Sequence, residues 1–181
     1  MTKCRITGDE LLLRPLAEAD LPLIVKWSGD EEINLLTDNA YPKTLDAAVE
    51  WFAEISANRQ ARAMLICLRD GTPIGNLELA EISWRTGEAE VRIRIGEREL
   101  WDQGWGAKAL NLLFEIAFVK MRLESLYLRV YTFNQRAIRC YSKVGFRPRG
   151  RICYGLEGEE KRELLLMTIK KKQYLRLKES A

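Results

Sequence analysis

A glycine-rich turn is the part of this sequence best suited to binding a ligand. It reads WDQGWGAKA over residues 101–109 and joins a strand-like stretch to a helix-like one. Gly104 and Gly106 would let the backbone approach a ligand closely and leave several N–H groups pointing outward. Because the first turn of a helix carries partial positive charge, a phosphate or pyrophosphate is the expected ligand. The alternative is a bare turn whose glycines serve only the backbone sterics.

The same turn matches the GxGxxA spacing of dinucleotide-binding folds through Ala109. That fingerprint follows the first strand of its sheet and needs an acidic residue at the end of the next strand. Here several strand-like stretches precede the turn, and the next one ends Val130-Tyr131-Thr132-Phe133 without an acid. A nicotinamide or ATP site is therefore not expected.

Acid–base chemistry in this chain must come from Glu, Asp, Tyr, Lys or Cys, because the chain contains no histidine. The absence of histidine excludes Ser-His-Asp and Cys-His catalysis within the chain and removes the commonest metal ligand. Four cysteines show no CxxC spacing, so we expect buried thiols and no metal site or redox pair.

Composition describes one globular domain of balanced charge. The chain has 181 residues, of which 47% are hydrophobic and 30% charged, with a formal net charge of +3. This charge is too small for a nucleic-acid footprint, and we interpret the basic run 170–172 as a solvated tail. No apolar run is long enough to cross a bilayer, and no signal peptide is recognised, so a cytoplasmic protein is expected.

The elements that would position these residues alternate between strand and helix. Strands are predicted at about 11–16, 63–69, 73–84, 88–95, 126–131, 149–154 and 161–168, with a turn at 155–158, and helices at about 20–27, 45–58, 106–122 and 134–145. Residues 88–95 alternate between apolar and charged side chains, which places them on opposite faces of the strand. Asp20 is expected to cap the first helix, and the inward-facing residues are Leu45, Val49, Phe52 and Ile55 in the second helix and Leu110, Leu113, Phe114, Ala117 and Met121 in the third. The unit 88–131 reads as strand, turn, helix, strand, which predicts a βαβ crossover with parallel strands. We therefore expect an α/β fold in which a mixed sheet has helices on both faces.

A second motif follows this unit directly and gives the sequence a family likeness. NQRAIRCYSKVGF at residues 134–146 fits NxxAxxxYxxxGF, and WxxGxG stands upstream at 101–106. In this order the two motifs resemble the GNAT superfamily of acetyl-CoA-dependent N-acetyltransferases, most of all the branch of ribosomal-protein-alanine and spermidine acetyltransferases. The resemblance covers about 10–170, so it implies one acetyltransferase domain over 1–181.

The resemblance also implies which residues bind acetyl-CoA, with no metal. The backbones of Ile93 and Ile95 would pair with the pantetheine arm, which Asn134 would also contact. The pyrophosphate would be held by Trp101, Gln103, Gly104, Trp105, Gly106, Ala107 and Lys108. Tyr141 would face the sulfur. By residue type alone, Asn134 is equally well interpreted as a helix N-cap.

Direct acetylation of an amine needs the neutral amine, although a lysine-like amine has a pKa near 10.4. At pH 7 only about one molecule in 2,500 is neutral, so a base that removes the proton lowers the barrier. Glu90 is the first candidate and Glu78 the second, with an ion pair between Glu90 and Arg92 or Arg94 as the alternative. Tyr141, with an ordinary pKa of about 10, can donate to the leaving thiolate.

The predicted partners are acetyl-CoA and a primary amine, namely a polyamine, an aminoglycoside-like amine or a protein N-terminus. The segment 29–39 carries four acids and no base, which favours a cationic amine. Two alternatives remain: a GNAT-fold domain that binds acyl-CoA as a sensor or scaffold without turnover, and a basic nucleic-acid module. Because edge strands of such folds often pair, a homodimer is also considered.

Overall fold

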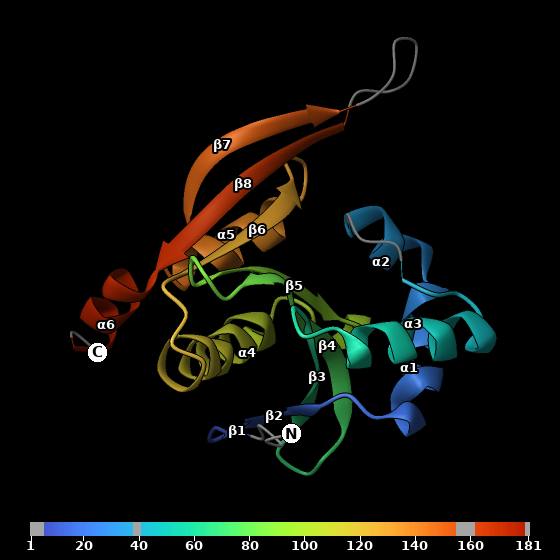
Figure 1. Cartoon of the computed structure of the whole chain (residues 1–181). Coiled ribbons are helices and arrows are strands. Elements are labelled where there is room, and N and C mark those ends of the chain that lie inside the picture. Colours follow the sequence, from blue (N-terminus) through green and yellow to red (C-terminus); the bar gives the residue numbers. More distant parts are fainter. Residues whose placement is uncertain (1–5, 38–40, 155–161, 180–181) are drawn as a thin grey trace.

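The computed structural model describes residues 6–37, 41–154 and 162–179. One sheet forms the centre of this described part (Figure 1). Within the described residues eight strands are hydrogen-bonded in the order β1-β2-β3-β4-β5-β6-β8-β7. Their bounds are β1 Ile6–Thr7, β2 Leu11–Pro15, β3 Arg62–Leu68, β4 Pro73–Ser83, β5 Glu88–Ile95, β6 Ser125–Tyr131, β7 Arg147–Tyr154 and β8 Arg162–Lys170. The pairing of β5 with β6 is parallel and all the others are antiparallel, so the predicted mixed sheet and βαβ crossover are confirmed.

Helices cover both faces of this sheet. They are α1 Leu21–Ser28, α2 Glu31–Leu36, α3 Leu45–Ala57, α4 Trp105–Phe114, α5 Gln135–Lys143 and α6 Lys171–Glu179, and α4 continues as a π-helix over Glu115–Lys120. Alternate residues of one strand serve two cores: Leu11 and Leu13 of β2 pack with α4, whereas Leu12 packs with Ile24 and Trp27 of α1. This period-2 division is what a strand covered on both sides requires.

Several sequence expectations about local structure are wrong in detail. Asp20 does not cap α1, because its carboxylate binds both terminal nitrogens of the Arg14 guanidinium at 2.7 Å and accepts from the N–H of Ala17. The apolar stripe of α3 is only partly covered, with Leu45 52% and Val49 43% exposed. The loop expected at 155–158 lies outside the described residues.

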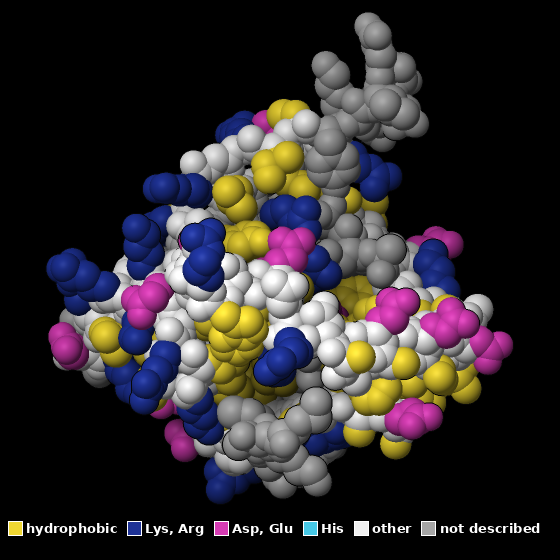
Figure 2. Space-filling view, in the orientation of Figure 1, with side chains coloured by type: hydrophobic (Ala, Val, Ile, Leu, Met, Phe, Trp, Pro, Cys, Tyr) yellow, Lys and Arg dark blue, Asp and Glu magenta, His cyan; other side chains and the backbone are white. Residues whose placement is uncertain are grey.

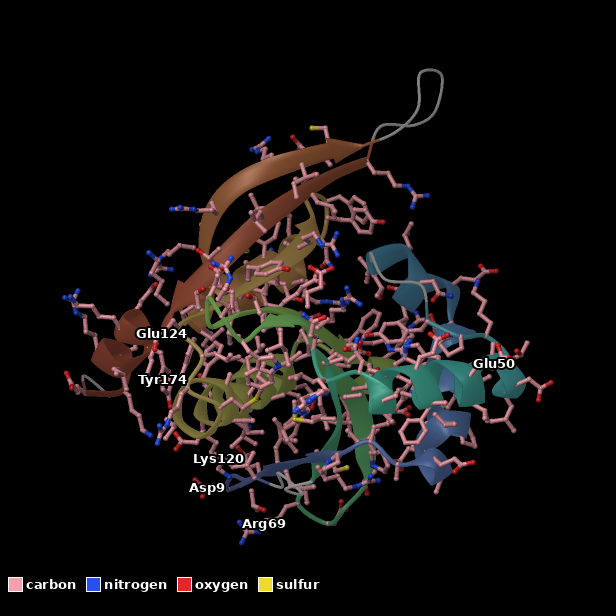
Figure 3. The ribbon with its side chains drawn as sticks, in the orientation of Figure 1. Asp9, Glu50, Arg69, Lys120, Glu124 and Tyr174 are labelled. Carbon is pink, nitrogen blue, oxygen red and sulfur yellow. The ribbon has the colours of Figure 1, made fainter. Side chains whose placement is uncertain are left out.

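The basic run 170–172 is not a tail. Lys170 ends β8 and Lys171 begins α6, a helix that the sequence analysis did not anticipate. Tyr174 fixes this helix: its ring stacks on Phe118 at 5.4 Å, and its hydroxyl donates to Glu115. Figure 3 places Tyr174 and Glu124 together at this junction, where the Lys171 ammonium lies 3.4 Å from the Glu124 carboxylate.

Candidate active site

The site begins where β5 and β6 stop pairing. Their parallel register ends at Glu90 opposite Tyr127, although both strands continue. On its other side β5 stays paired with β4, and the N–H of Gly96 donates to the Ile74 carbonyl at 2.8 Å. Because hydrogen-bonded positions alternate in an antiparallel pair, the backbone groups of Ile93 and Ile95 point away from β4, into the opening.

A cavity of about 300 Å³ occupies this opening. It extends from Ile33, Leu36 and Thr37, at and just after α2, to the first turn of α4 and one face of α5. Nine of the predicted site residues line it: Ile93, Ile95, Trp101, Gly104, Trp105, Gly106, Ala107, Asn134 and Tyr141. Segments more than 100 residues apart in the sequence therefore meet around one space.

Three predicted residues are not among those that line the cavity, Gln103, Lys108 and Glu90. The side-chain amide of Gln103 donates to the Glu99 carbonyl at 2.6 Å. The Lys108 ammonium lies 2.5 Å from the Glu10 carboxylate and 4.3 Å from the centre of the Trp105 ring. Both side chains are therefore engaged outside the cavity, and the backbone N–H of Lys108 donates to the Gly104 carbonyl at 3.1 Å.

The turn itself has the backbone expected for an anion site. Gly104 is the N-cap of α4 and lies in the left-handed region with φ of +83°, as does Asp102 with φ of +61°. The Trp105 indole N–H is buried and has no hydrogen-bond partner in the part of the chain that the structure describes. A Cβ at position 106 would lie 3.3 Å from the Cys140 Sγ, so glycine keeps this wall of the cavity open.

Cations from α5 complete this end of the cavity. Arg136, Arg139 and Lys143 all line it, and the Arg136 guanidinium lies 3.7 Å from the centre of the Trp101 ring. The Trp101 indole N–H donates to the Ile95 carbonyl, which fixes the ring over the strand end. With free helix N–H groups and three cations, this end of the cavity suits the phosphates of CoA.

Asn134 and Tyr141 also line the cavity from α5, Asn134 as its N-cap residue and Tyr141 within the helix. The Asn134 side-chain oxygen accepts from the N–H of Ala137 at 3.1 Å, so the N-cap role is present in the structure, and its amide donates to the Leu36 carbonyl. Tyr141 packs edge-on against Phe146 at 6.1 Å. Burial raises the pKa of Tyr141 above its ordinary value of 10, so its hydroxyl is protonated at neutral pH and available as a donor.

Glu90 is fully buried, and both its carboxylate oxygens face guanidinium groups. Arg92 donates to one oxygen at 2.8 Å and Arg129, from β6, donates to the other at 2.7 Å. The sequence left open an ion pair of Glu90 with Arg92 or Arg94 as the alternative to a catalytic base. The pair with Arg92 is present, and the second guanidinium comes from Arg129 and not from Arg94. The contact joins β5 and β6 at the point where they separate, which favours a structural contribution from Glu90.

Glu78 lies on β4 beside a residue that the sequence analysis did not single out, Tyr41. The Glu78 carboxylate interacts with the Tyr41 hydroxyl and accepts from the Asn76 side-chain amide at 3.4 Å. Burial raises the pKa of Glu78 above its ordinary value, only partly offset by the Tyr41 hydrogen bond. Asn76 in turn accepts from Arg94, which lines the cavity, so Glu78 is connected to the site through one intervening residue.

The acidic segment is partly neutralised. The Asp30 carboxylate accepts from the N–H groups of Glu32 and Ile33 and so caps α2. The Arg98 guanidinium lies 3.5 Å from Asp30 and also contacts Glu32, while Asp38 lies outside the described residues. Figure 2 still shows acidic side chains over α2 and α3 and basic ones over β7, β8 and α6.

Two further observations concern metals and membranes. Among residues 6–37, 41–154 and 162–179, no three His, Cys, Asp or Glu side chains are grouped as metal ligands would be. In the same part of the chain, no helix combines the length and apolar character needed to cross a bilayer.

Known proteins share this architecture. The Vibrio cholerae spermidine N-acetyltransferase, solved in complex with CoA and spermine, superimposes with a TM-score of 0.83 at 24% identity, over 93% of this chain and 99% of that one. The spermidine N(1)-acetyltransferase of Escherichia coli (strain K12) is 28% identical over 166 residues, 90% of this chain and 87% of that protein. The aminoglycoside N(6')-acetyltransferase type 1 of Klebsiella pneumoniae is 25% identical over 165 residues, 81% of this chain and 78% of that one.

The family assignment agrees with these relatives and with the two sequence motifs. The acetyltransferase (GNAT) domain family matches residues 10–147, which include both motifs and every residue that lines the cavity. The chain therefore belongs to the GNAT family and is an acetyl-CoA-dependent N-acetyltransferase.

Proposed function

We propose that the chain transfers an acetyl group from acetyl-CoA to a primary amine by direct attack, with both substrates bound together. The observation that carries this proposal is the continuity of the cavity from the α4 and α5 wall to α2. One substrate can enter from each side of the diverging strands and meet the other beside β5. The acceptors named for the two curated relatives, spermidine and aminoglycosides, are amines and support this acceptor class.

Acetyl-CoA, when bound, supplies an activated thioester carbonyl. The N–H groups at the start of α4 and the cations Arg136, Arg139 and Lys143 would hold its phosphates. The outward-facing backbone groups of Ile93, together with the N–H of Ile95, would pair with its pantetheine arm. Asn134 would contact the arm only with the amide capacity left by its two internal hydrogen bonds.

Tyr141 would donate its proton to the sulfur as the carbon–sulfur bond breaks. A cysteine-like thiol has a pKa near 8.5, so a donor that remains protonated at neutral pH stabilises the departing thiolate. Its position on the cavity wall, next to the backbone groups of β5, supports this role.

Proton removal from the amine would fall to Glu78 rather than to Glu90. A general base works best when its pKa approaches the working pH, and burial moves Glu78 in that direction. The oxygens of Glu90 already accept from two guanidiniums. Because Glu78 does not line the cavity, ordered water would have to carry the proton between the amine and this carboxylate.

The test is acetylation of a panel of amines with mass-spectrometric detection, run from pH 6 to pH 10 with the wild type, Glu78→Gln and Glu90→Gln. Acetylated products are expected from primary amines. Glu78→Gln should lose most activity at low pH and should recover as the pH approaches the pKa of the amine itself. CoA binding without any acetylated amine would contradict the proposed function, and a uniform loss in Glu78→Gln would contradict its role as base.

We also propose that the chain self-associates. A Vibrio cholerae relative forms a dodecamer. In the described part of the chain, β7 pairs on one side only, with β8, and Ile152 on it is 40% exposed. Light scattering after size exclusion is expected to give a mass above 20.9 kDa, and a strictly monomeric mass would contradict this proposal.

A further inference from the structure

Arg94 is a buried cation, and one of its nitrogens has no hydrogen-bond partner among the described residues. Its side chain is 4% exposed and lines the cavity. Nε donates to the Asn76 side-chain oxygen at 2.8 Å and one terminal nitrogen donates to the Ser28 hydroxyl at 3.1 Å, while the other terminal nitrogen is buried without a hydrogen bond. The guanidinium also lies 4.1 Å from the centre of the Tyr41 ring, which holds its plane in place.

The hydrogen-bond partners of Arg94 are neutral, and this distinguishes Arg94 from Arg14 and Arg92. Arg14 is paired with Asp20 and Arg92 with Glu90, whereas no carboxylate of the described residues lies within ion-pair distance of Arg94. Burial lowers the pKa of Arg94 below its ordinary value, but a guanidinium stays charged in a protein. A buried charge with an unmet donor is costly and calls for an oxygen ligand.

The direction of the side chain indicates which substrate would supply that oxygen. Ile93 and Ile95 pack with the core on the α4 face, where the phosphate-binding turn lies. Arg94 alternates to the opposite face, where its guanidinium meets Trp27, Tyr41 and Ser28. The unmet nitrogen is therefore on the α1 and α2 side of β5, the side left for the acceptor amine.

We infer that the preferred acceptor carries a carboxylate or carbonyl oxygen beside its amine, and that Arg94 binds this oxygen and determines specificity. This inference rests on the proposed amine acetylation and narrows it to α-amino acids and peptide N-termini, which share that chemistry. Guanidinium binds carboxylate through charge-assisted hydrogen bonds. A polyamine has no such oxygen, and its ammonium groups are repelled by Arg94, so the inference opposes the cationic acceptor suggested by segment 29–39.

Matched acceptors test the inference: alanine, which has a carboxylate, an alanyl peptide amide, which has a carbonyl, ethylamine, which has neither, and spermidine. In the wild type, kcat/KM for alanine or the peptide is expected to exceed that for ethylamine and spermidine at least tenfold. The comparison of alanine with the peptide distinguishes free amino acids from N-termini. Equal values for all four acceptors, or spermidine as the best acceptor, would overturn the inference.

Arg94→Met and Arg94→Lys assign the preference to this residue. Each should reduce the ratio of kcat/KM for the oxygen-bearing acceptor over ethylamine at least tenfold, about 1.4 kcal/mol. Because each amine keeps its own pKa with every variant, the change in ratio does not depend on amine basicity. Arg62→Gln, exposed and remote from the cavity, is the control and should leave the ratio unchanged.

CoA affinity, measured by calorimetry, separates the remaining outcomes. It should stay within twofold in both Arg94 variants. A large loss of CoA affinity with an unchanged acceptor ratio would mean that Arg94 binds the cofactor, and would overturn the inference. Arg94→Lys keeps the charge and decides the question if Arg94→Met fails to fold. No product from any amine would contradict the proposed function, whereas products without preference would contradict only this inference.

Discussion

The charged residues of β4 and β5 differ in the groups that they contact, and these contacts could not be predicted from the sequence. Alternation along residues 88–95 correctly separated Glu90 and Arg94 from the isoleucines. It could not show that tertiary packing buries this charged face, which leaves Glu90 1% and Arg94 4% exposed. Once buried, each charge depends on its neighbours: two guanidiniums bind Glu90, while Arg94 donates its hydrogen bonds only to neutral groups and interacts with the Glu78 carboxylate only through longer-range electrostatics. Residue type identified the candidates, but tertiary contacts determine what each can do.

Tyr141→Phe tests the proton donor at this scale, because it removes only the hydroxyl and keeps the ring against Phe146. Loss of a general acid typically lowers the rate about 10²–10⁴-fold, so kcat should fall by that amount while CoA affinity stays within twofold. Steady-state kinetics and calorimetry measure the two quantities. The matched control is Tyr127→Phe, because the Tyr127 hydroxyl donates to Glu81 and Tyr127 is not among the residues that line the cavity. A kcat for Tyr141→Phe within twofold of wild type would assign the residue to packing.

Most elements were predictable because their patterns are local. The strand over 88–95 has the bounds expected, and the helix that starts after Gly104 keeps the predicted inward residues Leu110, Leu113, Phe114 and Ala117 buried. The sequence analysis missed α2 and α6, since one is only six residues long and the other begins in a basic run. Both are stabilised by specific contacts, the Asp30 cap of α2 and Tyr174 of α6, which a periodicity search does not detect.

The turn before α4 can be tested as an element with a pair of glycine substitutions. Gly106→Val would direct a branched side chain at the Cys140 Sγ and into the phosphate end of the cavity. CoA affinity should fall at least tenfold, about 1.4 kcal/mol. Gly150→Val, where no atom lies within 4 Å of the added Cβ, is the control and should leave affinity unchanged. A folded Gly106→Val protein that binds CoA as wild type does would exclude this turn as the pyrophosphate site.

At the scale of the molecule, the cavity exists because two parallel strands separate after three paired positions. No local pattern encodes that separation, since residues 91–95 and 128–131 retain strand character on both sides of it. The family motifs predicted a CoA site, and nine of the twelve predicted site residues line the cavity, with Gln103, Lys108 and Glu90 outside it. The end of the cavity beside α2 could not be predicted. It depends on the positions of α2 and of Tyr41 against Arg94, and these positions follow from packing between residues far apart in the sequence.

The buried Glu78 makes the stability of the whole fold depend on pH. Because burial raises the pKa of Glu78 in the folded chain, the folded state holds this proton more tightly than the unfolded state does. Its contribution to the free energy of unfolding is therefore largest below the ordinary value near 4.5 and decreases as the pH rises through the folded pKa.

Glu78→Gln removes this titration while keeping an oxygen for Tyr41, so the variant should gain stability relative to wild type as the pH rises from about 4.5. The gain is at most about 1.4 kcal/mol for each pH unit and becomes constant above the folded pKa. Urea denaturation between pH 4.5 and 8 measures it. Glu50→Gln, on the exposed side of α3 (Figure 3), should follow the wild-type curve. Parallel curves for Glu78→Gln and wild type would mean that Glu78 titrates as an exposed carboxyl does, and would also remove the physical basis for its role as the base.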